Sequence, residues 1–272
     1  MVSWPDLGTR VTVRYRRPAG SVPPLTDAVG HLLAVDPVVR VRTKTGAVVE
    51  CAAADVVALR ELTDAPVRTD QIRALEHAAA AASPAVERAW LDGWLLRAAQ
   101  GATLEANSAV PLDISARPYA IPAIVAWYAH RELTPRLAIP DRLLRPPVGL
   151  ESEHTEKILV RDAPEGHPGV ALDNERDAGV TFGEFARAAV TDAPDGSRWV
   201  GLSEIRAADD HRGASRDCEA LLAWGACRGA TRGYMRVGEH DTNANALAES
   251  LRFRLHHRTR YFPVPAGTWD TV

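Results

Sequence analysis

The first sixty or so residues alternate between apolar and polar positions at the period of β-strands. Val11 and Val13 are separated by polar residues across 9–15, as expected for a half-buried strand. Three more apolar-rich runs follow, at residues 28–35, 38–42 and 47–51. Several short strands in so short a segment favour a small closed barrel, because closure removes exposed strand edges. We therefore predict a β-barrel domain over residues 1–63.

The apolar period becomes helical at Thr69, beyond a linker predicted at residues 63–66. Ile72, Leu75 and Ala79 fall on one face of this helix, and Pro84 lies beyond its predicted end.

A hairpin and a second helix are predicted next. Residues 93–112 indicate a hairpin with Gln100 and Gly101 near its turn. Pro118–Leu133 is amphipathic, and Pro118 suits the first turn of a helix. The apolar residues Ile121, Ile124, Val125 and Tyr128 lie along one face.

The C-terminal half alternates strands with helices after a polar junction at residues 146–185. That junction carries Pro and Gly, and within it only residues 157–160 have a strand pattern. Strands are predicted at 186–191, 199–207, 233–237 and 253–262, and helices at 215–228 and 245–251. Gly229 suits the residue just after a helix. No internal repeat is detected in the sequence.

Composition limits the classes of function. The 272 residues suggest two or three domains, and 46% hydrophobic with 25% charged residues is ordinary for a globular protein. A formal charge of −3 leaves no basic footprint for nucleic acid, which we do not expect as a partner. There is no apolar run of about 18 residues, nor a secretory signal. We predict a cytoplasmic protein that does not bind membranes.

Cysteine and histidine positions do not predict a metal site. Cys51, Cys218 and Cys227 are too widely spaced for a metal-binding pair, and we expect reduced, mostly buried thiols. His256 and His257 are neighbours on a predicted strand, where successive side chains point to opposite faces. We therefore expect them not to share an ion.

The order of elements over residues 186–263 resembles the cofactor half of the GNAT N-acetyltransferase superfamily. Residues 90–112 (WLDGWLLRAAQGATLEANSAVPL) and 249–262 (ESLRFRLHHRTRYF) are similar to an actinobacterial, mycobacterial-type group in which an SH3-like domain precedes the acetyltransferase. The resemblance implies an α/β (α+β) fold with a mixed central sheet flanked by helices. Residues 1–63 would be the SH3-like barrel, 64–156 the acceptor-side lobe and 157–272 the acetyl-CoA-binding part.

The resemblance also implies where acetyl-CoA would bind. GNAT proteins hold its pyrophosphate on a loop and helix N-terminus, where unpaired N–H groups and the helix dipole attract anions. Here the loop would supply His211, Arg212, Gly213, Ala214 and Ser215. The strand end before it, which would pair with the pantetheine arm, is Ile205, Arg206 and Ala207. Asn245 completes the implied cofactor-binding set.

The cofactor loop departs from the family pattern of a cation followed by two small residues. Placing the cation at Arg212 puts Ser215 and Asp217 at the small positions. Starting at Asp210 makes Gly213 and Ser215 the small residues but puts an acid where the cation belongs. The loop is about three or four residues shorter than is usual. Either the protein has a truncated loop or residues are missing from the sequence here and near 162–183, which normal Cα spacings would distinguish.

Catalytic candidates are few. Glu204 is on the strand that would face the acetyl group, and a carboxylate there could accept a proton from the amine, or could simply be a solvated or ion-paired surface group. Asp209, Asp210 and His211 are further candidates with the same alternative. Ala248 is at the position of the tyrosine acid that many GNAT enzymes use, and Ser250 is the nearest hydroxyl.

The predicted function is transfer of an acetyl group from acetyl-CoA to a primary amine on a small molecule or a protein. The alternative is a non-catalytic module that senses acyl-CoA or binds a protein, with the N-terminal barrel engaging the partner. Arg14, Arg16 and Arg17 form a modest basic edge on that barrel. Two groups with open roles remain: Trp90, Trp94 and Trp127 as core or acceptor cage, and Asn107 and Ser108 as acceptor or backbone ligands.

Overall fold

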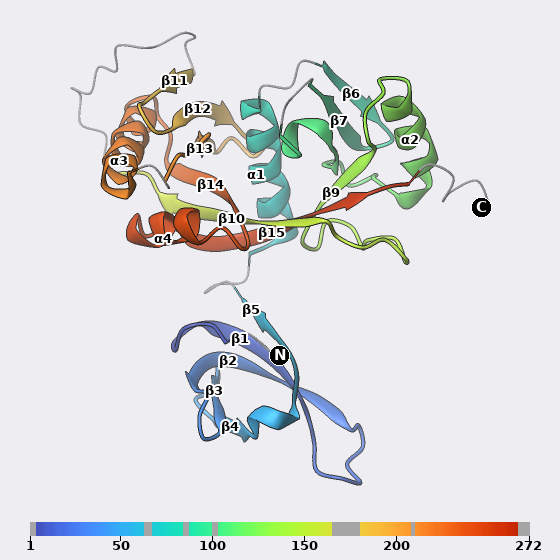
Figure 1. Cartoon of the computed structure of the whole chain (residues 1–272), viewed down its shortest axis with the longest axis vertical. Helices are drawn as coiled ribbons and strands as arrows, with labels where there is room; N and C mark the ends of the chain where they lie inside the picture. Colours follow the sequence, from blue (N-terminus) through green and yellow to red (C-terminus); the bar gives the residue numbers. More distant parts are fainter. Residues whose placement is uncertain are drawn as a thin grey trace. The chain divides into compact units, whose positions relative to one another are not determined.

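The computed structural model describes residues 4–62, 67–83, 87–99, 103–164, 180–207 and 210–265. The chain forms two compact units, Met1–Pro66 and Val67–Val272 (Figure 1). The predicted linker at residues 63–66 and the turn at Gln100 and Gly101 lie outside the described residues. The predicted boundary at 156/157 falls inside a strand of the second unit.

The first unit is an antiparallel sheet with the order β4-β3-β2-β1-β5. Its strands are β1 (Arg10–Arg16), β2 (Leu25–Ala34), β3 (Val39–Thr43), β4 (Val48–Cys51) and β5 (Val56–Glu61), with a 3₁₀ turn at Ala53–Asp55 before the last. The alternation on β1 and β3 buries Val11, Val13, Val39 and Val41 in one small core. The predicted closure is wrong: β4 and β5 are the two edges of an open sheet.

The second unit is built on a ten-stranded sheet with the order β11-β12-β13-β14-β10-β15-β9-β8-β7-β6. The strands are β6 (Glu87–Leu91), β7 (Trp94–Ala98), β8 (Ala109–Pro111), β9 (Arg136–Pro140), β10 (His154–Asp162), β11 (Val180–Phe182), β12 (Arg187–Asp192), β13 (Arg198–Ser203), β14 (Arg232–Gly238) and β15 (Arg254–Pro263). The helices are α1 (Thr69–Ala82), α2 (Ile121–Ala129), α3 (His211–Cys227) and α4 (Thr242–Ser250), with 3₁₀ turns at Glu105–Asn107 and Pro118–Ala120.

This sheet repeats one arrangement in its two halves. In the first half, β8 and β9 are parallel and α2 connects them. In the second, β13 and β14 are parallel and α3 connects them. Figure 1 shows α2 near one end of the sheet and α3 near the other. The sequence analysis missed this repeat, because it lies in the connectivity and not in similar residues.

The halves exchange strands at the centre of the sheet. β10 follows the first half in the sequence, yet it pairs with β14 of the second. β15 ends the second half and pairs with β9 of the first. β10 and β15 also pair with each other, so the two halves share one continuous sheet.

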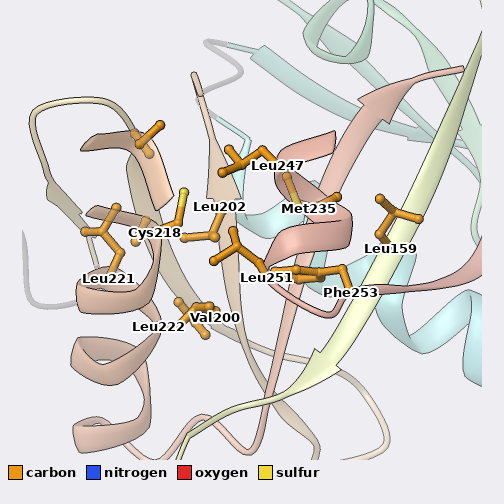
Figure 2. Packing of buried hydrophobic residues seen from close by; sticks show 14 of the residues in the cluster. Leu159, Val200, Leu202, Cys218, Leu221, Leu222, Met235, Leu247, Leu251 and Phe253 are labelled. Atoms are coloured by element: carbon orange, nitrogen blue, oxygen red, sulfur yellow. The ribbon is translucent and has the colours of Figure 1, made fainter. Parts of the chain in front are cut away.

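Helices cover both faces of the second half of the sheet. Alternation along β13 directs Val200 and Leu202 toward α3, and Figure 2 shows them packed against Cys218, Leu221 and Leu222. Trp199 points to the opposite face and packs against α1. Burial of these side chains supplies the main driving force for packing the helices onto the sheet.

Several predicted boundaries move. The four-residue strand expected at 157–160 is the nine-residue β10, which lies at the centre of the sheet. The strand expected at 199–207 ends at Ser203, and α2 ends at Ala129. α3 begins at His211 and not near Ser215, and it runs without interruption from Arg212 to Asp217. No helix among the described residues is long and apolar enough to cross a membrane.

Candidate functional site

The strands β13 and β14 separate at the point where the resemblance places the acetyl group. Their last paired residues are Leu202 and Met235. β14 continues to Gly238, where it pairs only with β10. Beyond Ser203, Glu204 has a φ of 55°, a left-handed conformation that turns the chain out of the strand. One edge of β14 is therefore left open beside the departing strand.

The segment after Glu204 is held by the turn between β11 and β12. The Arg206 N–H donates to the Phe185 carbonyl oxygen at 2.9 Å, and the Arg206 guanidinium contacts the Glu184 carbonyl. Ile205 packs against the core beneath α3, and Ala207 is buried. Among the described residues, the main chain of Ile205 forms no backbone hydrogen bond. Of the predicted strand-end residues, Arg206 therefore has its N–H engaged, whereas the main chain of Ile205, next to the open edge of β14, is a candidate to pair with a ligand.

A cavity of about 220 Å³ lies on the α1 side of the diverging strands. The end of α1 forms one wall with Ala79, Ala82 and Ser83. The cavity is also lined by charged side chains from several elements: Glu105, Glu156, Arg187, Glu204 and Arg236. Glu204 is the only one of these that the sequence analysis selected. It lies at the exposed rim and also faces a neighbouring hollow with Ile205 and Arg206.

The floor of the cavity is a buried network centred on Arg236. Its guanidinium contacts Glu76 at 2.6 Å, Glu156 at 3.3 Å and Glu105 at 3.6 Å. Glu156 also accepts a hydrogen bond from the Tyr261 hydroxyl at 2.7 Å. These residues come from α1, β10, β14, β15 and the turn before β8, so the network spans both halves of the sheet.

The electrostatics of this network follow from burial and pairing. Burial alone would raise the pKa of Glu76, but Arg236 and His257 outweigh it and hold that pKa well below its usual range. Burial, with the charge of Glu156 adding to it, raises the pKa of Tyr261 well above its ordinary value. Tyr234 on the cavity wall is raised in the same way, chiefly by burial. The tyrosines therefore stay neutral at physiological pH, while Glu76 stays ionised.

The structure corrects the prediction that the side chains of His256 and His257 point to opposite faces. A β-bulge pairs Ile158 with His257 and Leu159 with Leu255, so His256 is the extra residue on β15. The two Nδ1 atoms are 2.8 Å apart as a result, and not on opposite faces as predicted. His257 Nε2 lies 2.8 Å from a Glu76 carboxylate oxygen. The pair thus extends the buried network, and no metal-binding group of three such ligands occurs in the described ranges.

A second hollow lies at the N-terminus of α3. It is lined by His211, Arg212, Ser215, Arg216 and Ser250. Three basic side chains beside the positive end of a helix suit phosphate groups. The sequence analysis included His211, Arg212 and Ser215 but missed Arg216, which is one helical turn beyond Arg212.

Other features of this helix start are less suited to phosphate. Gly213 and Ala214 are buried in the first turn, so they do not form the open loop that we predicted. Asp210 caps α3 by accepting the Arg212 N–H at 3.0 Å, which places a carboxylate at the helix end. The basic side chains fit the phosphates of acetyl-CoA, whereas Asp210 opposes them.

Residues from α4 have mainly structural contacts. Asn245 donates to the carbonyl groups of Gly238 and Asp241 and accepts from Lys157. Ala248 is buried, and the Ser250 hydroxyl donates to the Leu247 carbonyl. No side chain able to protonate a thiolate is present at Ala248.

The remaining aromatic and polar candidates divide between core and surface. Trp94 is fully buried and takes the core role, whereas Trp90 is 57% exposed and stacks on His77, so the core role that we considered does not apply to it. Asn107 accepts the Ala99 N–H, and Ser108 donates to the Glu105 carbonyl. These bonds match the backbone role that we considered for both residues.

Surface groups of the first unit are partly paired. Arg14 forms a two-pronged contact with Asp27, and Arg17 contacts the carbonyls of Val22 and Pro23. Cys51 in this unit is half-buried, while Cys218 is buried and Cys227 is exposed in the second.

Sequence signals existed for the cavity residues that were missed. Arg236 interrupts the otherwise apolar run of β14, and a charge at such a position is seldom buried without a partner. Glu105 lies two residues before Asn107 and three before Ser108, both of which were selected. Their assembly could not be predicted, because it depends on the exchange of β10 and β15.

Family models match both units of the chain. The family model "Probable histone acetyltransferase Rv0428c C-terminal" matches residues 69–178 and 171–262. The model "Rv0428c N-terminal Sm-like domain" matches residues 5–60, so the SH3-like assignment is not confirmed. "Probable histone acetyltransferase Rv0428c" of Mycobacterium tuberculosis is 61% identical, with all of both chains covered. Their alignment spans 303 positions against 272 residues here, so that relative has segments that this chain lacks.

Solved structures show more distant similarity. A GCN5-related N-acetyltransferase from Kribbella flavida is 14% identical, covering 75% of this chain and 98% of its own, with a TM-score of 0.45. A GCN5-related N-acetyltransferase from Sphaerobacter thermophilus is 13% identical, covering 54% and 68%, with a TM-score of 0.34. The family models and the 61% identical relative show that the chain belongs to the Rv0428c family of acetyltransferases, with an Sm-like domain ahead of the C-terminal domain.

Proposed function

We propose that the second unit transfers an acetyl group from acetyl-CoA directly to a primary amine. The observation that carries this proposal is the cavity beside the diverging strands β13 and β14, with three carboxylates in its lining. Glu105, Glu156 and Glu204 would attract a protonated amine and disfavour an anionic acceptor. Membership of an acetyltransferase family supports the same reaction.

Acetyl-CoA, when bound, supplies the activated acetyl group and the thiol that leaves. The open edge of β14 and the main chain of Ile205 would hold its pantetheine arm by backbone hydrogen bonds. His211, Arg212 and Arg216 would neutralise its phosphates. Ala207, Gly213 and Ala214 are buried, so we assign them to packing. Asn245 is assigned to holding the start of α4, because it donates to the carbonyls of Gly238 and Asp241.

Direct transfer requires chiefly that both substrates be positioned and that one group receive the amine proton. The cavity offers Glu204, selected from the sequence, together with Glu105 and Glu156 as bases. Arg236 forms ion pairs with Glu156 and Glu105, and Arg187 adds a second positive charge to the lining. A water-filled rim at Glu204 would let the proton leave to solvent.

The test is acetyl-CoA turnover with a panel of amines, read as release of free thiol. The panel contains lysine peptides, including a histone-tail peptide because of the name of the relative, as well as polyamines and aminoglycosides. A protein-only blank corrects for the exposed Cys227. Amine-dependent release that saturates with acceptor supports the proposal. Acetyl-CoA binding without release for any amine would reject catalysis.

A non-catalytic acyl-CoA sensor is the second candidate, and Ala248 favours it. The buried alanine provides no acid for the leaving thiolate, and Asp210 occupies the helix end expected for phosphate. In that case acetyl-CoA should raise the melting temperature by mass action while thiol release stays at the blank. No acyl-CoA binding would exclude both functions.

A further inference from the structure

The carboxylates lining the cavity differ in how fully they are engaged. Glu156 is held by Arg236 at 3.3 Å and by the Tyr261 hydroxyl at 2.7 Å. Both contacts are made to the same oxygen atom, Oε2, so that atom has little hydrogen-bonding capacity left for an amine. Glu204 is exposed on a turn at the rim, where water competes for any amine. Neither position combines shielding from water with free hydrogen-bonding capacity.

Glu105 combines shielding from water with free hydrogen-bonding capacity. Its side chain is 22% exposed, and its Oε1 lies 3.4 Å from Arg97 Nη1 and 3.6 Å from Arg236 Nε. Both distances are long for charge-assisted hydrogen bonds, which are usually about 2.7–2.9 Å. Two cations thus hold the carboxylate in place without using its lone pairs fully.

Unpaired donors on the two arginines also indicate that the hydrogen bonds around Glu105 are incomplete. The Nε atoms of Arg97 and Arg236 are buried, and neither has a hydrogen-bond partner among the described residues. The Arg97 side chain is only 2% exposed, and an unsatisfied buried donor is costly. A movement of Glu105 by a few tenths of an ångström toward Arg236 would satisfy one of them. Contacts in catalytic sites are often long in the free enzyme and tighten when substrate binds.

We infer that Glu105 binds the ammonium group of the acceptor and takes its proton, with Arg97 and Arg236 as positioning residues. This inference rests on the proposed function. Glu105 belongs to the first half of the sheet, whereas β13 and β14 belong to the second, so the reaction site draws on both.

The acceptor ammonium loses two protons during the proposed transfer. The ammonium gives one proton to the Glu105 carboxylate, and the resulting neutral amine attacks the thioester carbonyl carbon. The C–N bond forms, the C–S bond breaks, and the second amine proton goes to the departing thiolate through water to give the free thiol. Glu105 returns its proton to solvent. The products are the acetylated amine, the thiol of coenzyme A and one proton.

The experiment compares Glu105→Gln with Glu156→Gln and Glu204→Gln in the full chain. For Glu105→Gln we expect kcat to fall by about a hundredfold or more near pH 7. The loss should shrink as pH rises toward the pKa of the acceptor, because the free amine then forms without a base. The dissociation constant for acetyl-CoA should stay within about twofold of wild type. Glu156→Gln and Glu204→Gln test the other two carboxylates as bases, and a shifted pH profile in either one, with none in Glu105→Gln, would assign the proton transfer to that residue instead. Glu219→Gln lies outside the cavity and is the control, which should keep the wild-type pH profile.

Melting temperature and circular dichroism establish that each variant is folded, and Glu105→Asp provides a second test. Aspartate keeps the carboxylate but shortens its reach, so it should recover part of the activity lost in Glu105→Gln. A folded Glu105→Gln protein within threefold of wild type, or with an unshifted pH profile, would overturn the role of Glu105 while leaving the proposed function intact. Absence of thiol release by the wild type rejects the proposed function and this role together.

Discussion

Glu76 shows what a single buried charge requires. Its side chain is 3% exposed, and its two oxygen atoms accept from Arg236 at 2.6 Å, His257 at 2.8 Å and Thr259 at 2.9 Å. Because these partners hold its folded-state pKa below the unfolded value, the ionised group contributes stability above its unfolded pKa of about 4.3. That contribution is lost as pH falls through the folded pKa.

Replacing Glu76 should therefore destabilise the second unit strongly. We expect Glu76→Gln to lower the free energy of unfolding at pH 7 by about 3–5 kcal/mol, because the buried Arg236 loses its closest carboxylate. Urea unfolding followed by tryptophan fluorescence measures this. Glu219→Gln removes an ion pair near the surface with Arg161 and is the control, with an expected cost below about 1 kcal/mol. Equal effects of the two variants would contradict the assignment.

As pH falls, the protein should begin to lose stability at a higher pH than protonation of its carboxylates alone would cause. Burial, followed by the charge of His257, lowers the pKa of His256 to about 3. An unfolded histidine titrates near 6.5, so the unfolded state binds more protons between these values and stability falls as pH drops from about 6.5 to 3. Unfolding midpoints at pH 7.5, 6, 5 and 4 should decrease steadily. His256→Gln should flatten the part between 6.5 and 5, and an unchanged slope would refute this cause.

Asp210 provides a residue-scale test of the cofactor site. Asparagine caps helices as well as aspartate, so Asp210→Asn should keep α3 intact while removing a negative charge from its N-terminus. We expect acetyl-CoA to bind several-fold more tightly, and the gain to shrink at high salt. Calorimetric titration measures the affinity. Asp241→Asn changes the equivalent cap of α4 and should leave the affinity for acetyl-CoA nearly unchanged.

At the scale of elements, the fit of α3 on the sheet depends on one glycine. A Cβ atom at Gly225 would come within 2.5 Å of the Val200 side chain, so the helix lies too close to β13 for any larger residue. Gly229, at the end of the same helix, is present for a different reason, since its φ of 83° is left-handed.

Whether Gly225→Ala raises or lowers the free energy of unfolding tests how closely α3 packs on β13. In an open helix, glycine to alanine gains up to about 1 kcal/mol. Here we expect Gly225→Ala to lose about 1–3 kcal/mol, because overpacking displaces α3 from β13. Thermal unfolding measures the change. Gly229→Ala should cost about 1–2 kcal/mol through its left-handed backbone alone. A stabilised Gly225→Ala protein would show that the contact relaxes without cost.

The helices and strands could be predicted from the sequence with different success. The burial of Ile72, Leu75 and Ala79 was predicted correctly, because a helical period reports directly which face is covered. β10 was underestimated, since Glu156 and Lys157 look like surface residues until their partners, Tyr261 on β15 and Asn245 in α4, are known. The cavity was missed for the same reason. Local patterns predict elements, whereas Arg236 and its carboxylates meet only through long-range pairing.

At the scale of the whole molecule, the exchanged strands join the two halves of the sheet. β10 supplies the partner of β14, and β15 supplies the partner of β9. Despite the repeated arrangement, neither half has its own complete set of strands. The buried network around Arg236 crosses the same seam.

The halves should consequently fail to fold separately. We expect a fragment of residues 67–152 to show no cooperative thermal transition, because β9 would expose an unpaired edge. A fragment of residues 67–265 retains every strand of the sheet and should unfold cooperatively. Differential scanning calorimetry distinguishes them. A sharp transition in the shorter fragment would indicate that the first half is self-sufficient.

The position of β15 also governs when this protein can fold during its synthesis. Residues 254–263 lie between β9 and β10, at the centre of the sheet, yet the ribosome makes them after every other strand. Until they emerge, the nascent chain carries two sheet edges with no partner, and their closure joins residues far apart in sequence. We expect this unit to complete its fold only after β15 has left the exit tunnel, and to need protection from aggregation until then.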